Sequence, residues 1–119
     1  MDFPKPDRAT TELFEDVVPR GPTVKLRPMF GYIAAFANGH MFACTPDHQL
    51  VVRLPEEDRK ALLDSGTSMF EPIRGRKMKE YVVLPEPLKR EPDRVRELMS
   101  KSLLWVGTFP PNVGKRRSK

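Results

Sequence analysis

The first twenty residues carry the apolar pattern of one amphipathic helix. Leu13, Phe14 and Val17 fall on one face when residues 8–18 are wound at helical spacing. Asp7 precedes this segment as a helix-capping residue, and a proline directly follows it. The pattern predicts a helix over residues 8–18 whose apolar face must pack against another element.

The apolar period changes after residue 30. Asn38 and Gly39 separate two apolar runs, and this dipeptide favours a tight hairpin because both central positions of a type I′ turn need positive φ. A second turn at residues 46–48 precedes a run rich in β-branched side chains. Residues 20–28 hold a glycine and two prolines, which is typical of a connection. The pattern predicts an antiparallel meander of three strands, at residues 32–37, 40–44 and 49–54.

The second half of the chain contains two further helical patterns. Pro55 opens a helix whose first turn holds three acidic residues, and Gly66 is placed to end it. Apolar residues spaced three and four apart predict a last helix between Pro92 and Pro110. Between these helices the pattern predicts an edge strand at 69–72, a loop at 74–77 and a strand at 80–84.

The order of these elements indicates the fold class. A meander with helices at intervals, in the order αβββαββα, is typical of an α+β domain with helices packed on an antiparallel sheet. The length allows one such domain, which we expect over residues 1–110. Residues 111–119 are expected to form a basic, disordered tail.

Charge narrows the candidate sites to two short segments. The chain has 21 basic and 16 acidic residues and a net charge of +5, but four positive charges lie in the last five positions. The rest of the chain is nearly neutral, which excludes a domain coated with positive charge for nucleic acid. The basic loop at residues 74–79 and the tail at residues 115–119 remain as possible contacts for phosphate or an acidic partner. Their alternative roles are protection of a sheet edge and solubility. The candidate residues are Arg74, Arg76, Lys77, Lys79, Lys115, Arg116 and Arg117.

Residues that usually carry catalysis are sparse. Cys44 follows apolar neighbours and is expected to be a buried thiol. His40 and His48 lie at opposite ends of one predicted strand, roughly 25 Å apart, and cannot share a metal ion. The sequence shows no metal-ligand spacing, no phosphate-binding glycine loop and no dinucleotide motif. We therefore expect a protein that is not an enzyme and that binds neither cofactor nor metal.

The ends of the chain and its apolar runs bear on location. The N-terminal residues are polar and lack the apolar stretch of 7 to 15 residues that a signal peptide needs. The longest apolar run, residues 32–37, is far below the ~20 residues of a membrane span. A single cysteine cannot form an internal disulfide. These observations predict a cytoplasmic protein.

Several short motifs, in order, resemble the N-terminal domain of the TfoX/Sxy family. They cover residues 28–111 and are Met29-Phe30-Gly31, Asn38-Gly39 with Met41-Phe42-Ala43, Leu50 to Arg53, Phe70-Glu71-Pro72, Met78, Tyr81 to Pro85, and Leu103 to Pro111. Arg53 stands where the resemblance would place a lysine. The resemblance implies a secretion-chaperone-like αβββαββα fold in a bacterial protein. It also implies a link to transcription and natural competence. The helical second domain of full-length members is expected to be absent here, and the resemblance supplies no catalytic residues.

These observations predict a non-enzymatic binding or regulatory module that acts through protein contacts. Direct, low-specificity nucleic-acid binding through the basic loop and tail is the alternative, and a small-molecule sensor is a third option. Tyr81 and Trp105 could stack on bases, although packing against the sheet or a subunit is the simpler role. We expect a protein partner, and no membrane. Four aromatic residues near the chain ends could also form a homodimer surface: Phe3, Phe14, Trp105 and Phe109.

Overall fold

The structure, a computed structural model, describes residues 8–29, 32–46, 49–73 and 75–110. The side chains of residues 29, 72, 73, 76 and 77 lie outside the description. The elements are α1 (Arg8–Val17), β1 (Val24–Met29), β2 (Tyr32–Ala37), β3 (His40–Cys44), β4 (Val51–Arg53), α2 (Glu56–Asp64), β5 (Ser68–Ile73), β6 (Arg76–Val83), α3 (Glu86–Lys89) and α4 (Pro92–Val106).

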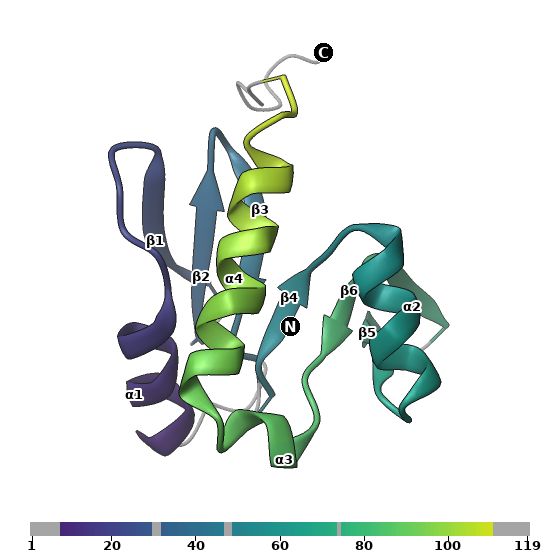
Figure 1. Cartoon of the computed structure of the whole chain (residues 1–119). Helices are drawn as coiled ribbons and strands as arrows, with labels where there is room; N and C mark the ends of the chain where they lie inside the picture. The colour runs from purple at the N-terminus through teal and green to yellow at the C-terminus, as the bar shows by residue number, and fades with distance from the viewer. Residues whose placement is uncertain (1–7, 30–31, 47–48, 74, 111–119) are drawn as a thin grey trace.

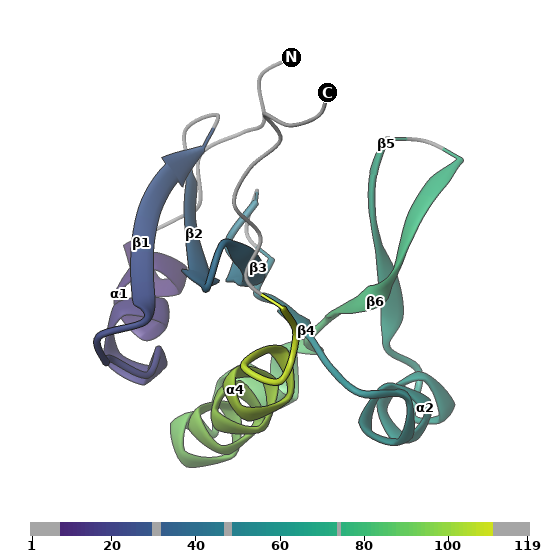
Figure 2. The same cartoon turned by 90° about the horizontal axis from the view of Figure 1, so that it is seen from above.

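The strands form one antiparallel sheet in the order β1-β2-β3-β4-β6-β5. Helices α1, α4 and α2 lie on one side of this sheet (Figures 1 and 2). The α+β class predicted from the sequence is therefore confirmed. The predicted hairpin is also present, since Asn38 and Gly39 both have positive φ, 53° and 83°.

Two sequence predictions about strands were wrong. The expected connection at 20–28 contains the edge strand β1, in which half-buried Val24 and Leu26 alternate with exposed Lys25 and Arg27. This alternation has the strand period, but the nearby prolines and glycine concealed it. The expected loop at 74–77 is shorter than predicted, because β6 already begins at residue 76. The short helix α3 was not predicted either.

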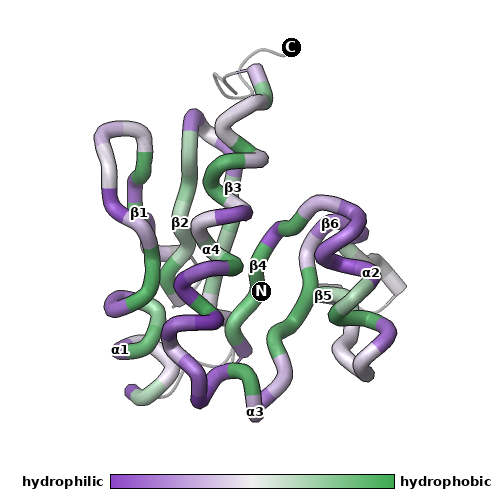
Figure 3. Tube along the Cα trace, viewed as in Figure 1, coloured by the Kyte–Doolittle hydropathy of each residue, from purple (hydrophilic) through white to green (hydrophobic). Residues whose placement is uncertain are grey.

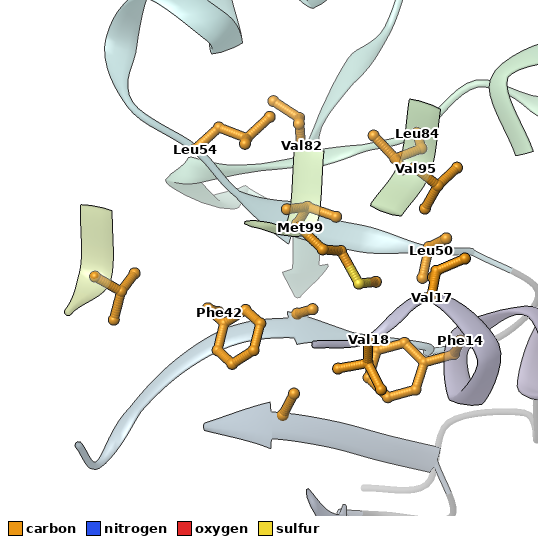
Figure 4. Close-up of a cluster of buried hydrophobic side chains, with 14 of the residues drawn as sticks. Phe14, Val17, Val18, Phe42, Leu50, Leu54, Val82, Leu84, Val95 and Met99 are labelled. Atoms are coloured by element: carbon orange, nitrogen blue, oxygen red, sulfur yellow. The ribbon is translucent and has the colours of Figure 1, made fainter. Parts of the chain in front are cut away.

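The main hydrophobic core lies between the sheet and the helices (Figure 4). Phe14 and Val17 enter it from α1, and Met99 enters it from α4. Phe42 and Val82 meet them from the sheet, and all five side chains are at most 1% exposed. Burying a side chain of this size contributes roughly 1.5–3 kcal/mol, so this layer holds α1 and α4 on the sheet.

A second cluster of buried residues separates from this core because side chains alternate between the faces of a strand. In β4, for example, Val51 joins the second cluster whereas Val52 joins the main core. Cys44 and Tyr81 also belong to the second cluster. The hydropathy colouring follows this burial, with apolar central strands and mixed apolar and polar stretches along α2 and α4 (Figure 3).

Both edges of the sheet contain a proline. Pro28 lies in β1, and Pro72 lies in β5. The pairing of β5 with β6 is also irregular at two places. A proline has no amide hydrogen, so each edge strand lacks one donor from its backbone.

The described part of the chain holds no helix with the length and apolar composition that a bilayer crossing requires.

Candidate functional site

The predicted basic loop is only partly described by the structure. Arg74 and the tail cations Lys115, Arg116 and Arg117 lie outside the described residues. Residues 76 and 77 belong to β6, although their side chains are not described. The turn before them is built on Gly75, whose φ is +84° and whose amide donates to a Glu71 carboxylate oxygen at 2.6 Å. Of the seven candidate cations, Lys79 alone has a described side chain, and it is exposed.

Lys79 lies beside helix α2. The sequence did not predict this proximity. A guanidinium nitrogen of Arg59 donates to the backbone carbonyl of Lys79 at 3.1 Å, and this bond joins α2 to β6. These two elements and β5 line a surface pocket of about 470 Å³, which we call the α2–β6 pocket. It is lined by Glu56, Arg59, Lys60, Leu63, Asp64, Met69 and Lys79.

The α2–β6 pocket combines an apolar floor with a charged rim. Leu63 and Met69 are half-buried and supply the apolar side chains. Lys60 and Lys79 are exposed, and neither side chain forms an ion pair or hydrogen bond with any residue that the structure describes. Their charges are therefore available to an anionic group on a ligand.

Arg53 lies at the centre of a separate group of side chains. Its Nε and Nη2 contact the same Glu80 carboxylate oxygen at 2.8 and 2.6 Å. Its guanidinium carbon lies 5.4 Å from the ring centroid of Tyr81, 5.8 Å from that of Trp105 and 4.9 Å from that of Phe109. These distances are within the range of cation–π interactions. We call these five residues the Arg53 cluster.

The Arg53 cluster fixes the end of α4 against the sheet. The rings of Trp105 and Phe109 meet edge to face at 5.0 Å. Phe109 also meets the His40 ring at 5.3 Å, and His40 Nε2 lies 2.7 Å from the carbonyl oxygen of Pro110. Because a carbonyl oxygen can only accept, the His40 nitrogen donates this bond. His40 thus makes a contact with a residue 70 positions away in the sequence, whereas His48 lies outside the described residues.

The aromatic residues considered as stacking platforms are engaged inside the protein. Tyr81 is 8% exposed, and its hydroxyl donates to the Met41 carbonyl at 2.7 Å. Trp105 is half-buried and contacts Arg53 and Phe109. One residue of the predicted homodimer surface, Phe14, was wrongly assigned, because it is fully buried in the main core. Helix α1 places its apolar face against the sheet, and Phe14 lies on that face. Phe3 lies outside the described residues.

Cys44 is a buried thiol, as predicted. Burial raises its pKa from 9.0 to about 12, so the thiol stays protonated at neutral pH. A protonated thiol is not a nucleophile. Burial, with a smaller electrostatic effect of Cys44, also raises the pKa of Tyr32 to about 12. The described residues contain no group of three or more His, Cys, Asp or Glu side chains that could hold a metal ion.

Comparison with known families identifies the domain. The model of the TfoX N-terminal domain matches residues 12–104, which is most of the chain. The chain belongs to the TfoX N-terminal domain family. The match begins within α1, upstream of the motifs that carried the resemblance, and extends into α4. A search of curated proteins finds no significant match to this TfoX N-terminal domain.

Proposed function

We propose that this TfoX N-terminal domain is a non-enzymatic regulatory module that acts by binding another protein, in transcription or competence regulation. Family membership carries the proposal, because the family match extends from within α1 through most of α4. A shared fold alone would not support a function, since one fold hosts many activities. The regulatory role therefore comes from the family, and the binding role is argued from the surface of the domain.

Two features of the surface support protein binding. The α2–β6 pocket has a volume of about 470 Å³ and offers exposed cations beside apolar side chains. Leu104 lies on the outer side of α4 and is 76% exposed. Among the described residues it is the large hydrophobic residue whose side chain is exposed rather than buried or half-buried. Apolar side chains near uncommitted charges are a common composition for protein contact surfaces.

The proposal is tested by isolating the full chain, with an affinity tag, from cells of its source at physiological salt. We expect one protein to co-purify in near-stoichiometric amount, and deletion of the domain to change transcript levels of a coherent gene set. The matched control is an unrelated tagged domain of similar charge. Absence of a partner, together with turnover of a phosphorylated substrate from a test panel, would contradict the proposal.

A further inference from the structure

We propose that the α2–β6 pocket binds a short acidic segment of a partner protein, by taking up one large apolar side chain between flanking carboxylates. This inference rests on the proposed protein-binding function and specifies its surface and ligand chemistry. The pocket volume, about 470 Å³, is within the range of about 300–1,000 Å³ that is typical of ligand sites.

The floor of the pocket favours an apolar side chain. Leu63 comes from α2 and Met69 from β5, so the apolar surface bridges two elements. Methionine is unbranched and polarisable and adapts to ligands of different shape. Lys60 and Lys79 also line the pocket, and the methylene stems of lysine side chains commonly cover apolar surface.

The rim favours carboxylates on the ligand. Lys60 lies on α2 and Lys79 on β6, so the two uncommitted ammonium groups project from different walls of one pocket. Arg59 adds a third cation, which is held by its bond to the Lys79 carbonyl. A peptide with acids on both sides of an apolar residue can pair with both walls while the apolar residue is buried.

The same rim disfavours a nucleic-acid backbone. Glu56 and Asp64 also line the pocket, and their carboxylates would repel a continuous row of phosphates. A peptide can avoid this repulsion because its charges are separate and its backbone is neutral. Helix α2 offers no aromatic side chain, which single-stranded nucleic acids commonly use for stacking.

The experiment is a selection of random dodecapeptides displayed on phage against the full chain. We expect enriched peptides to share one Leu, Ile, Phe or Met flanked by Asp or Glu. The affinity of an enriched peptide, measured by fluorescence anisotropy, should fall at least about tenfold in the double variant Lys60→Glu/Lys79→Glu. Both side chains are exposed, so the variant is expected to fold.

A matched control separates the pocket from general electrostatics. Lys25→Glu/Arg90→Glu changes the net charge equally at exposed positions away from the pocket, and it should keep the affinity within about twofold. A peptide whose apolar residue is replaced by Ser should bind at least about tenfold more weakly. Equal losses in the two double variants, equal binding of the Ser peptide, or no acidic consensus would overturn the proposal. A twelve-nucleotide single-stranded DNA serves as a competing ligand. The proposal would also be overturned if this DNA bound the wild-type chain more strongly than the enriched peptide does and did not bind the Lys60→Glu/Lys79→Glu variant.

The result is distinguishable from failure of the proposed function. If the Lys60→Glu/Lys79→Glu chain still co-purifies with the same cellular protein as the wild-type chain, the module binds a protein through another surface. In that case the pocket assignment fails and the proposed function stands.

Discussion

Helices α4 and α2 lie on the same side of one sheet but are attached to it very differently. α4 has 15 residues and buries Val95, Met99, Ser102 and Val106. α2 has nine residues, and none of them is buried. Its links to the rest of the domain are half-buried Leu62 and Leu63, an ion pair between Asp58 and Lys101 at 3.3 Å, and the Arg59 bond to β6.

This difference separates structural and binding roles within one layer of helices. A helix that is buried along one face has few side chains left for a ligand, and its loss removes the core. A helix held by partial burial keeps most of its side chains at the surface and can adjust without unfolding the sheet. The α2–β6 pocket lies on the second kind of helix, where binding interferes least with stability.

The sharpest test of this contrast is truncation of one apolar side chain in each helix. Met99→Ala removes a fully buried side chain from the core and should lower the free energy of unfolding by about 2–5 kcal/mol. Leu62→Ala removes a half-buried side chain and should cost about 1 kcal/mol. Urea denaturation followed by circular dichroism measures both. Equal losses would show that α2 is as much a part of the core as α4.

Alkaline pH should destabilise the sheet through groups that α2 does not contain. The pKa values of Cys44, Tyr32 and Tyr81 are raised to about 12 in the folded chain, chiefly by burial. Their contribution to the free energy of unfolding is fully present below the ordinary pKa values, 9.0 for cysteine and 10.0 for tyrosine. It is lost as pH rises toward 12, because the unfolded chain releases these protons at lower pH than the folded chain does. Denaturation at stepped pH should show this fall, and Cys44→Ala should reduce it. An unchanged slope in the variant would contradict the prediction.

The Arg53 cluster tests how firmly the end of α4 is attached. Arg53→Ala removes three ring contacts and the pair with Glu80, and it should cost about 1–2 kcal/mol. Arg53→Lys keeps the charge but loses the planar group, so its loss should be intermediate. Fluorescence of Trp105, the one tryptophan in the chain, reports both unfolding and the local contact.

Arg96, an exposed arginine of α4, is the control for Arg53. Arg96 pairs with Asp16 and Asp93 at the surface, where its side chain is 44% exposed. Arg96→Ala should cost at most about 1 kcal/mol and leave the Trp105 emission unchanged. A larger loss for Arg96 than for Arg53 would refute the role given to the Arg53 cluster.

The smallest expected effect is at the end of α2. Gly66 has φ +102°, and an added Cβ meets nothing within 4 Å, so Gly66→Ala should cost about 1 kcal/mol through backbone strain alone. Gly21 has equally open surroundings without positive φ, and Gly21→Ala should be neutral or slightly stabilising. Thermal unfolding compares the two. Similar melting temperatures for both variants would show that the end of α2 relaxes without strain.

Local signals allowed much of the fold to be predicted. The Asn38-Gly39 hairpin, the start of α2 after Pro55 and the apolar face of α4 all depend on residues close in sequence. β1 was missed because its exposed cations and flanking turn residues hide a short alternation. The start of β6 was not predicted because the charged residues before position 80 lack the apolar alternation of a strand.

The candidate sites were less predictable because tertiary contacts assemble them. Lys79 was singled out for its basic neighbours, but its partner Arg59 lies 20 residues away on a helix. Arg53 was singled out by its place in a family motif, whereas two of its three rings come from Trp105 in α4 and from Phe109 just after α4. No periodicity in the sequence connects such residues.

The prolines in β1 and β5 have a consequence for the behaviour of the chain at high concentration. A sheet with two unpaired edges can recruit identical chains edge to edge and grow into a fibril, and cells must then dispose of the aggregate. Pro28 and Pro72 each break the row of donors that such growth would copy. The two prolines therefore disfavour edge-to-edge assembly of the domain at high concentration.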